Sequence, residues 1–178
     1  MKTNKHAVLV GVAAVGKTTL GQEAAANLGI PCFDVELVGE QELGMTIDEL
    51  SECGWKDLQI NEEFWQVYQE LLRSSESSII VASPRLVDRP DFWNLSYPRA
   101  ITVHLRWLPL RILRRELAIL GSMAEEDVVL TEGAKRDYYD YYWWRLAHCR
   151  KADNELRLSG DLAIDTDRLV RLLEPENG

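Results

Sequence analysis

The chain has 178 residues, of which 46% are hydrophobic, and this is enough material for one ordinary core, so we predict a single domain over residues 1–178. The formal net charge of −9 at pH 7 argues against a general binder of nucleic acids or anionic membranes, because most of the surface would repel either polyanion. The three cysteines form no C-x-x-C pair, which indicates neither a disulfide framework nor a zinc site and favours a reducing cytoplasm.

The first motif in chain order is the segment 11–18, GVAAVGKT, which fills the pattern G-x-x-x-x-G-K-[ST] of a phosphate-binding loop. A short apolar run, residues 6–10, precedes it and an alanine-rich stretch, residues 19–28, follows it, so a strand and a helix flank the loop as the motif requires. The loop supplies converging N–H donors, a lysine for the outer phosphates and a hydroxyl for magnesium. The residues expected to bind ATP and Mg²⁺ here are Gly11, Ala13, Ala14, Val15, Gly16, Lys17, Thr18 and Thr19.

Two acidic residues lie at the end of the next predicted strand. The turn LGIP at 28–31 ends the first helix, and residues 32–36 form a strand in which Asp34 and Glu36 point to the same side. Ligands of parallel sheets collect at the carboxyl ends of the strands, so we expect this pair beside the loop. There it can hold magnesium-bound water and a substrate hydroxyl. The alternative is a solvated acidic strand end.

The rest of the chain alternates helices with strands. A capping box at Thr46 and Glu49 predicts a short helix, and an apolar stripe predicts a longer one over about 57–73. The other predicted elements are strands over 78–82, 100–105 and 161–165, helices over 109–120 and 166–173, and a mobile acidic connection over 121–133. This order predicts an α/β protein with the P-loop NTPase fold, a five-stranded parallel sheet with helices on both faces. Apart from the apolar run that enters the phosphate loop, no apolar stretch approaches the length of a membrane span.

Residues 135–145, KRDYYDYYWWR, are the most aromatic part of the chain. On a helix the rings of residues 138–144 would surround the axis, so they cannot all face one core. Some of them must cover another element of the protein, a ligand or a second copy of the chain. A homodimer through this stretch is therefore one of three alternatives, and packing against the body of the protein is the simplest.

From position 11 to about position 139 the chain resembles the shikimate kinase family of small ATP-dependent kinases. Beyond the loop the likeness lies in the spacing of the turn 28–31, Asp34, Glu36, Gly44, Ile47 and Glu49. The resemblance implies substrate-binding helices over about 37–73 and a lid over about 116–134. It also implies that Asp34 lies near the magnesium. Glu36 stands where the family uses an aspartate to hold the substrate hydroxyls and help activate the attacking one.

The resemblance assigns roles to two arginines as well. Arg115 corresponds to a family arginine that packs on adenine, and Arg136 with Tyr139 corresponds to a pair whose arginine binds the substrate carboxylate. Residues 163–166 resemble the family strand that leads to the adenine loop, and they also resemble the closing strand of cytidylate-kinase-like proteins.

The chain departs from the family pattern where the substrate would bind. Gln59 replaces a carboxylate-binding arginine, and the segment 84–86, PRL, replaces a triple-glycine substrate loop. No arginine occurs between positions 116 and 135, although the family lid carries one. Because an arginine is a charged, bidentate partner for a carboxylate, its loss favours a different, less anionic acceptor, with Arg85 as a compensating cation.

The sequence thus predicts a kinase that transfers the γ-phosphoryl group of ATP to a hydroxyl of a small-molecule acceptor. The predicted catalytic residues are Lys17, Asp34 and Glu36, the metal ligands are Thr18 and Asp34, and the substrate-binding residues are Glu36, Gln59, Arg85 and Arg136. Arg111 or Arg114 could instead supply the missing lid charge. Two alternatives stay open, a nucleoside or nucleotide kinase of the cytidylate kinase type and a non-catalytic sensor domain that binds nucleotide or another ligand.

Overall fold

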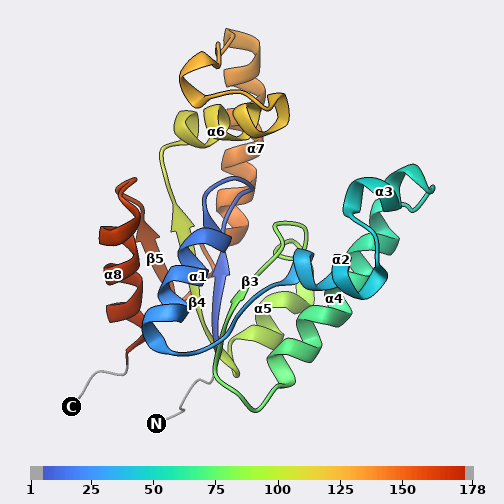
Figure 1. Ribbon diagram of the computed structural model, residues 1–178, viewed down its shortest axis with the longest axis vertical. Coiled ribbons are helices and arrows are strands. Elements are labelled where there is room, and N and C mark those ends of the chain that lie inside the picture. Colours follow the sequence, from blue (N-terminus) through green and yellow to red (C-terminus); the bar gives the residue numbers. More distant parts are fainter. Residues whose placement is uncertain (1–5, 175–178) are drawn as a thin grey trace.

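The computed structural model describes residues 6–174 and contains a five-stranded sheet in the order β2-β3-β1-β4-β5 (Figure 1). All of its strand pairs are parallel, as expected where helices separate each strand from the next. The strands are β1 His6–Val10, β2 Cys32–Asp34, β3 Ser78–Val81, β4 Ala100–Arg106 and β5 Asn154–Arg157. The helices are α1 Lys17–Leu28, α2 Val35–Leu43, α3 Ile47–Glu52, α4 Asp57–Arg73, α5 Pro90–Ser96, α6 Pro109–Gly121, α7 Glu132–Cys149 and α8 Leu162–Leu173, with a 3-10 turn, η1, at Glu125–Asp127.

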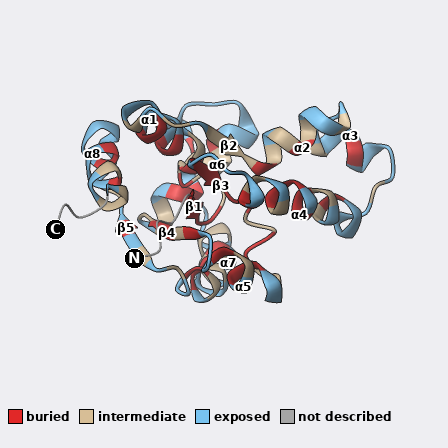
Figure 2. Cartoon of the chain, turned by 90° about the horizontal axis from the view of Figure 1, so that it is seen from below, coloured by how far each residue is buried: buried red, intermediate tan, exposed pale blue. Residues whose placement is uncertain are grey.

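The sheet carries a hydrophobic core on each face, because successive residues of a strand point to opposite sides. In β1, Ala7 and Leu9 pack into one core while Val8 and Val10 pack into the other. The helices α1, α6, α7 and α8 contribute buried residues to the first core, and α2 to α5 contribute to the second. Figure 2 shows the buried sides of these helices turned toward the sheet. The predicted α/β architecture with helices on both faces is therefore confirmed.

The third and fourth helices begin where their sequence signals place them. Glu49 Oε2 accepts a hydrogen bond from the Thr46 backbone N–H at 2.8 Å, and Thr46 Oγ1 accepts one from the Glu49 N–H at 3.3 Å, which confirms the capping box. The prediction for α4 is also confirmed, and its apolar stripe buries Phe64 and Tyr68 completely. Within residues 6–174, no helix combines the length and apolarity needed to span a bilayer.

The prediction of a fifth strand at 161–165 is wrong. The fifth strand is β5, and residues 161–165 form the start of α8, where Asp161 Oδ1 accepts a hydrogen bond from the Ile164 N–H at 3.1 Å. This capping interaction favours a helix start over a strand. β5 was missed because it is an edge strand in which only Leu156 is buried, so its sequence, NELR, lacks an apolar run. The predicted helix over 166–173 therefore begins earlier, at Leu162.

The second strand is shorter than predicted. It ends at Asp34, whose Oδ1 accepts a hydrogen bond from the Glu36 backbone N–H at 3.0 Å and so caps α2. Glu36 consequently lies in the first turn of a helix rather than on the strand. The helix α5 was not predicted, and the connection predicted over 121–133 is shortened because α7 already begins at Glu132.

Candidate active site

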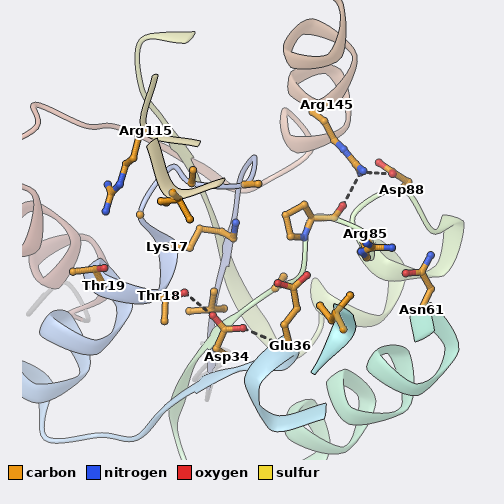
Figure 3. Close-up of a pocket in the computed structure, with 18 of the residues that line it drawn as sticks. Lys17, Thr18, Thr19, Asp34, Glu36, Asn61, Arg85, Asp88, Arg115 and Arg145 are labelled. Carbon is orange, nitrogen blue, oxygen red and sulfur yellow. Dashed lines mark hydrogen bonds and ion pairs between the residues drawn. The ribbon is translucent and has the colours of Figure 1, made fainter. Parts of the chain in front are cut away.

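A cavity of about 690 Å³ opens beside the phosphate loop and the ends of β2 and β3. The residues that line it, many of them drawn in Figure 3, are Ala13, Ala14, Gly16, Lys17, Thr18, Thr19, Asp34, Glu36, Ile47, Asp57, Asn61, Val81, Ala82, Pro84, Arg85, Asp88, Arg115, Ile119, Tyr141 and Arg145. We call the side with the loop, Asp34 and Arg115 the phosphate half. We call the side formed by Glu36, Asp57, Asn61, Arg85, Asp88 and Arg145 the acceptor half.

The phosphate loop connects β1 to α1, as predicted, and its backbone follows a tight path. Gly16 has φ of 101° and Ala14 has φ of 56°, both in the left-handed region that favours glycine. A Cβ on Gly11 would lie 2.9 Å from the Leu105 carbonyl oxygen, so the loop approaches β4 too closely for a side chain there. Gly11, Val12 and Val15 are thus buried beneath the loop, while Ala13, Ala14 and the residues 16–19 line the cavity.

Lys17 is buried and folds back over its own loop. Its Nζ donates hydrogen bonds to the carbonyl oxygens of Gly11 at 3.2 Å and Val12 at 3.0 Å. Burial lowers the pKa of Lys17, an effect that Glu36 and Asp34 oppose. Because no carboxylate accepts a hydrogen bond from this ammonium, its charge can act on an anion bound at the loop.

Thr18, Asp34 and Glu36 form a continuous chain of hydrogen bonds. Thr18 Oγ1 donates to Asp34 Oδ2 at 2.5 Å, the Glu36 N–H donates to the other oxygen of Asp34, and Ser83 Oγ donates to Glu36 Oε1 at 2.6 Å. Figure 3 shows Asp34 next to Thr18 at the start of α1, and Glu36 on the side of Asp34 that faces away from α1. The hydroxyl of Thr18 and the carboxylate of Asp34 are oxygen ligands of the kind that Mg²⁺ takes together with phosphate oxygens. Residues 6–174 contain no cluster of three or more His, Cys, Asp or Glu side chains that could hold a metal by themselves.

Arg115 on α6 lies over the phosphate loop. A Cβ on Gly16 would be 3.4 Å from its Nη1, so the guanidinium lies directly above the loop. Arg115 also lines a second, smaller cavity of about 160 Å³, together with Trp107 and Leu158. The two cavities share Gly16, Thr19 and Arg115, so the smaller one continues the phosphate half. Part of its wall is formed by Leu158 and Gly160 before α8 and by Leu162 and Asp165 in the first turn of α8, the region where the strand was predicted.

The structure separates the predicted substrate-binding residues. Arg85 lines the cavity, but its Nη1 forms an ion pair with Asp57 Oδ1 at 2.7 Å. Gln59 is exposed, lies outside the cavity lining, and accepts a hydrogen bond from the Lys56 N–H at 2.9 Å. Arg136 is exposed on α7 and also lies outside the lining.

Arg111 and Arg114, the other candidates for the missing lid charge, lie away from the phosphate loop. They line a separate cavity with Glu125 and Glu126 of the connection between α6 and α7.

Arg145, the second arginine of the acceptor half, was not predicted from the sequence. Its Nη1 donates hydrogen bonds to the Pro84 carbonyl oxygen at 2.6 Å and to Asp88 Oδ2, with which it forms an ion pair. Its guanidinium carbon lies 4.7 Å from the Trp144 ring centroid and 5.6 Å from that of Tyr141. The spacing of Tyr141 and Arg145 on one helix could have indicated a shared face. Asp88 gave no such signal, because the fold alone brings its loop to α7.

The rings of the aromatic stretch 135–145 lie in three environments: the core, the wall of the cavity and the surface. Tyr138 and Tyr142 are buried in the core, which confirms packing against the body of the protein, and Tyr141 lines the cavity. Trp143 and Trp144 are each 50% exposed. Contact of these two rings with a second copy of the chain stays a prediction.

The shikimate kinase family model matches residues 13–137. Shikimate kinase from Synechococcus sp. (strain JA-3-3Ab) is 33% identical over 112 residues, which cover 60% of this chain and 55% of that protein. Shikimate kinase from Rhodococcus jostii (strain RHA1) is 46% identical over 44 residues, 25% of this chain and 26% of that protein. The chain therefore matches about a quarter and about half of the length of these two relatives.

Among solved structures, shikimate kinase from Acinetobacter baumannii in complex with shikimate superposes with a TM-score of 0.79 at 20% identity, over 97% of this chain and 94% of that one. This likeness confirms the P-loop NTPase fold. The match of the family model extends over more than half of the 178 residues. The chain belongs to the shikimate kinase family.

Proposed function

We propose that the protein is an ATP-dependent kinase that transfers the γ-phosphoryl group to a hydroxyl of a small-molecule acceptor. The observation that carries this proposal is the convergence of Lys17, Thr18, Asp34 and Glu36 on one cavity, with the two carboxylates at the boundary between its phosphate and acceptor halves. Phosphoryl transfer depends on positioning and charge neutralisation, and these side chains supply both. Membership of the shikimate kinase family supports the same reaction class.

In this proposal the phosphates of ATP lie in the loop. The backbone N–H groups of residues 13–17 bind them, Lys17 neutralises the outer ones, and Thr18 with Asp34 holds Mg²⁺. The adenine base of ATP lies in the smaller cavity, between Arg115 and Trp107. When bound there, Mg²⁺ would offset the negative charge of the phosphates.

Glu36 receives the proton of the acceptor hydroxyl. As the hydroxyl oxygen forms its bond to the γ-phosphorus, the bond from that phosphorus to ADP breaks and ADP carries the electron pair away. The hydrogen bond from Ser83 fixes one oxygen of the Glu36 carboxylate and leaves the other for the acceptor. Residues 116–134 would form a lid over the site. Arg115, which directly precedes this lid, is the arginine that the proposal uses beside the loop.

The test is acceptor-dependent ADP release, measured with shikimate, sugars, nucleosides and nucleoside monophosphates. Turnover with one of these classes that is lost in Lys17→Ala supports the proposal. Absence of acceptor-dependent ADP with every class, while ATP still binds, overturns it in favour of the non-catalytic sensor. The sensor is the second candidate because no arginine occurs between positions 116 and 135.

The cellular location and the assembly state belong to the proposal as well. The cysteines Cys32, Cys53 and Cys149 are all free thiols, which fits a reducing cytoplasm. A homodimer would use the half-exposed Trp143 and Trp144. Sedimentation equilibrium of the wild type and of Trp143→Ala with Trp144→Ala tests this, because a monomeric wild type removes the homodimer.

A further inference from the structure

The acceptor half differs from a typical anion site in that its cations are already paired. We propose that the acceptor is an uncharged polyol, with hydroxyl groups but neither a carboxylate nor a phosphate. This inference rests on the proposed function, because it names the substrate class of the same cavity. It replaces the expectation that Arg85 serves as a free compensating cation.

Each guanidinium of the acceptor half has a carboxylate partner. Arg85 pairs with Asp57 at 2.7 Å, and Arg145 pairs with Asp88. With Glu36 included, the acceptor half presents three carboxylates against two guanidinium groups. An anionic ligand would have to displace one of these carboxylates or bind beside it, and like charges in a partly buried site disfavour both.

Arg145 is also fixed by contacts that a ligand would have to break. Its side chain is only 14% exposed, it donates a hydrogen bond to the Pro84 carbonyl oxygen, and its guanidinium lies over the rings of Trp144 and Tyr141. Turning this group toward a ligand carboxylate would cost the ion pair with Asp88 as well. Arg145 therefore acts as a structural brace of the wall rather than as an anion receptor.

The polar atoms without a partner in the acceptor half point to a ligand that donates hydrogen bonds. Asn61 Oδ1 and Asp88 Oδ1 are buried acceptors with no hydrogen bond, and Arg145 Nε is a buried donor with none. His148 Nδ1, the other group that faces Asp88 Oδ1, is 4.0 Å away, which is beyond hydrogen-bond distance. A hydroxyl both donates and accepts, whereas a carboxylate or phosphate dianion only accepts. Alcohol groups thus match this set of atoms better than an anion does.

A matched pair of ligands tests the inference without requiring turnover. Shikimate and its methyl ester keep the same ring hydroxyls but differ in charge, and calorimetry with Mg-ADP present measures the affinity of each. We expect the wild type to bind the ester at least as tightly as shikimate. A preference for shikimate of about tenfold or more would overturn the proposal.

Two variants test the same preference independently of the absolute affinity of the wild type. Asp88→Asn frees Arg145 and Asp57→Asn frees Arg85, so each should raise the affinity for shikimate by about tenfold relative to the ester. Asp57 is 79% exposed, so Asp57→Asn should fold normally even if Asp88→Asn does not. Asp91→Asn, an exposed residue at the start of α5, is the matched control and should change neither affinity. No gain for shikimate in either variant shows that the paired carboxylates do not exclude anions, and the proposal fails.

Failure of the proposal of an uncharged acceptor can be distinguished from failure of the proposed kinase function. Loss of the kinase proposal appears as absence of acceptor-dependent ADP release with retained ATP binding. The ligand preference of the acceptor half is read from direct binding, so it can hold or fail whichever result the turnover assay gives.

Discussion

The cationic side chains of the two halves of the cavity have different partners. In the phosphate half, Lys17 donates hydrogen bonds only to the neutral carbonyl oxygens of Gly11 and Val12, so its charge can act on a bound phosphate. In the acceptor half, Arg85 and Arg145 are both neutralised by carboxylates. The comparison shows that the presence of an arginine in a cavity does not by itself make an anion site, because its partners decide whether the charge is available.

The largest effect is expected from Lys17→Ala, which removes the lysine cation of the phosphate half. Removing the cation that neutralises the outer phosphates should lower kcat/KM for acceptor-dependent ADP release about 10³-fold. The measurement is a coupled ADP assay. Lys135→Ala is the matched control, because Lys135 pairs with Glu132 on the surface of α7 and lies outside the cavity. Undiminished turnover in Lys17→Ala would remove the phosphate-loop interpretation.

At the boundary between the halves, Glu36→Gln should lower kcat about 10²-fold, because an amide cannot take the proton of the acceptor hydroxyl. ATP affinity should stay unchanged, since the backbone of Glu36 still donates to Asp34 and that carboxylate still faces Thr18. Steady-state kinetics and equilibrium ATP binding separate the two effects. Glu42→Gln on the exposed side of the same helix should alter neither, and a comparable loss there would point to disruption of α2.

One residue outside both halves, His104, is expected to make the stability of the protein depend on pH. This effect must be measured before a change of rate with pH is assigned to the active site. Burial lowers the pKa of His104 on β4 to about 4. The unfolded chain binds a proton on this ring near its ordinary pKa of about 6.5, whereas the folded chain does not. The contribution of His104 to the free energy of unfolding should therefore be fully present above about pH 7 and fall by about 3 kcal/mol as the pH drops toward 4. Urea unfolding measures this, and His104→Phe should show a smaller fall over the same range.

The smallest expected effect compares the two ion pairs of the acceptor half. Asp88→Ala leaves the nearly buried guanidinium of Arg145 without its carboxylate and should lower the free energy of unfolding by about 1–3 kcal/mol. Asp57→Ala breaks a pair in which the carboxylate is 79% exposed, and should cost less than about 1 kcal/mol. Chemical denaturation of both variants gives the comparison. Equal losses would mean that Arg145 does not brace the wall more strongly than Arg85 does.

Local sequence signals predicted the elements that depend on local interactions. The capping box at Thr46 and the apolar stripe of α4 are satisfied within a few turns of chain, so their signals were sufficient. The edge strand β5 could not be predicted in this way, since it is held by pairing with β4 and has no apolar run of its own. The start of α8 at Asp161 was predicted as a strand because the sequence alone does not show whether an aspartate caps a helix or lies at the end of a strand.

The sequence by itself determined the phosphate loop, the choice of Asp34 and Glu36 as the acids that follow it, and most helices and strands of the α/β fold, because each of these depends on a contiguous segment whose geometry is set by glycines, caps and apolar spacing. Only the tertiary structure decided the acceptor half. It brings Asp57 of α4 to Arg85, and Arg145 of α7 to a loop that precedes it by 61 residues at Pro84. Ion pairs between such distant segments depend on the packing of α4 and α7 around the sheet, which no local pattern records.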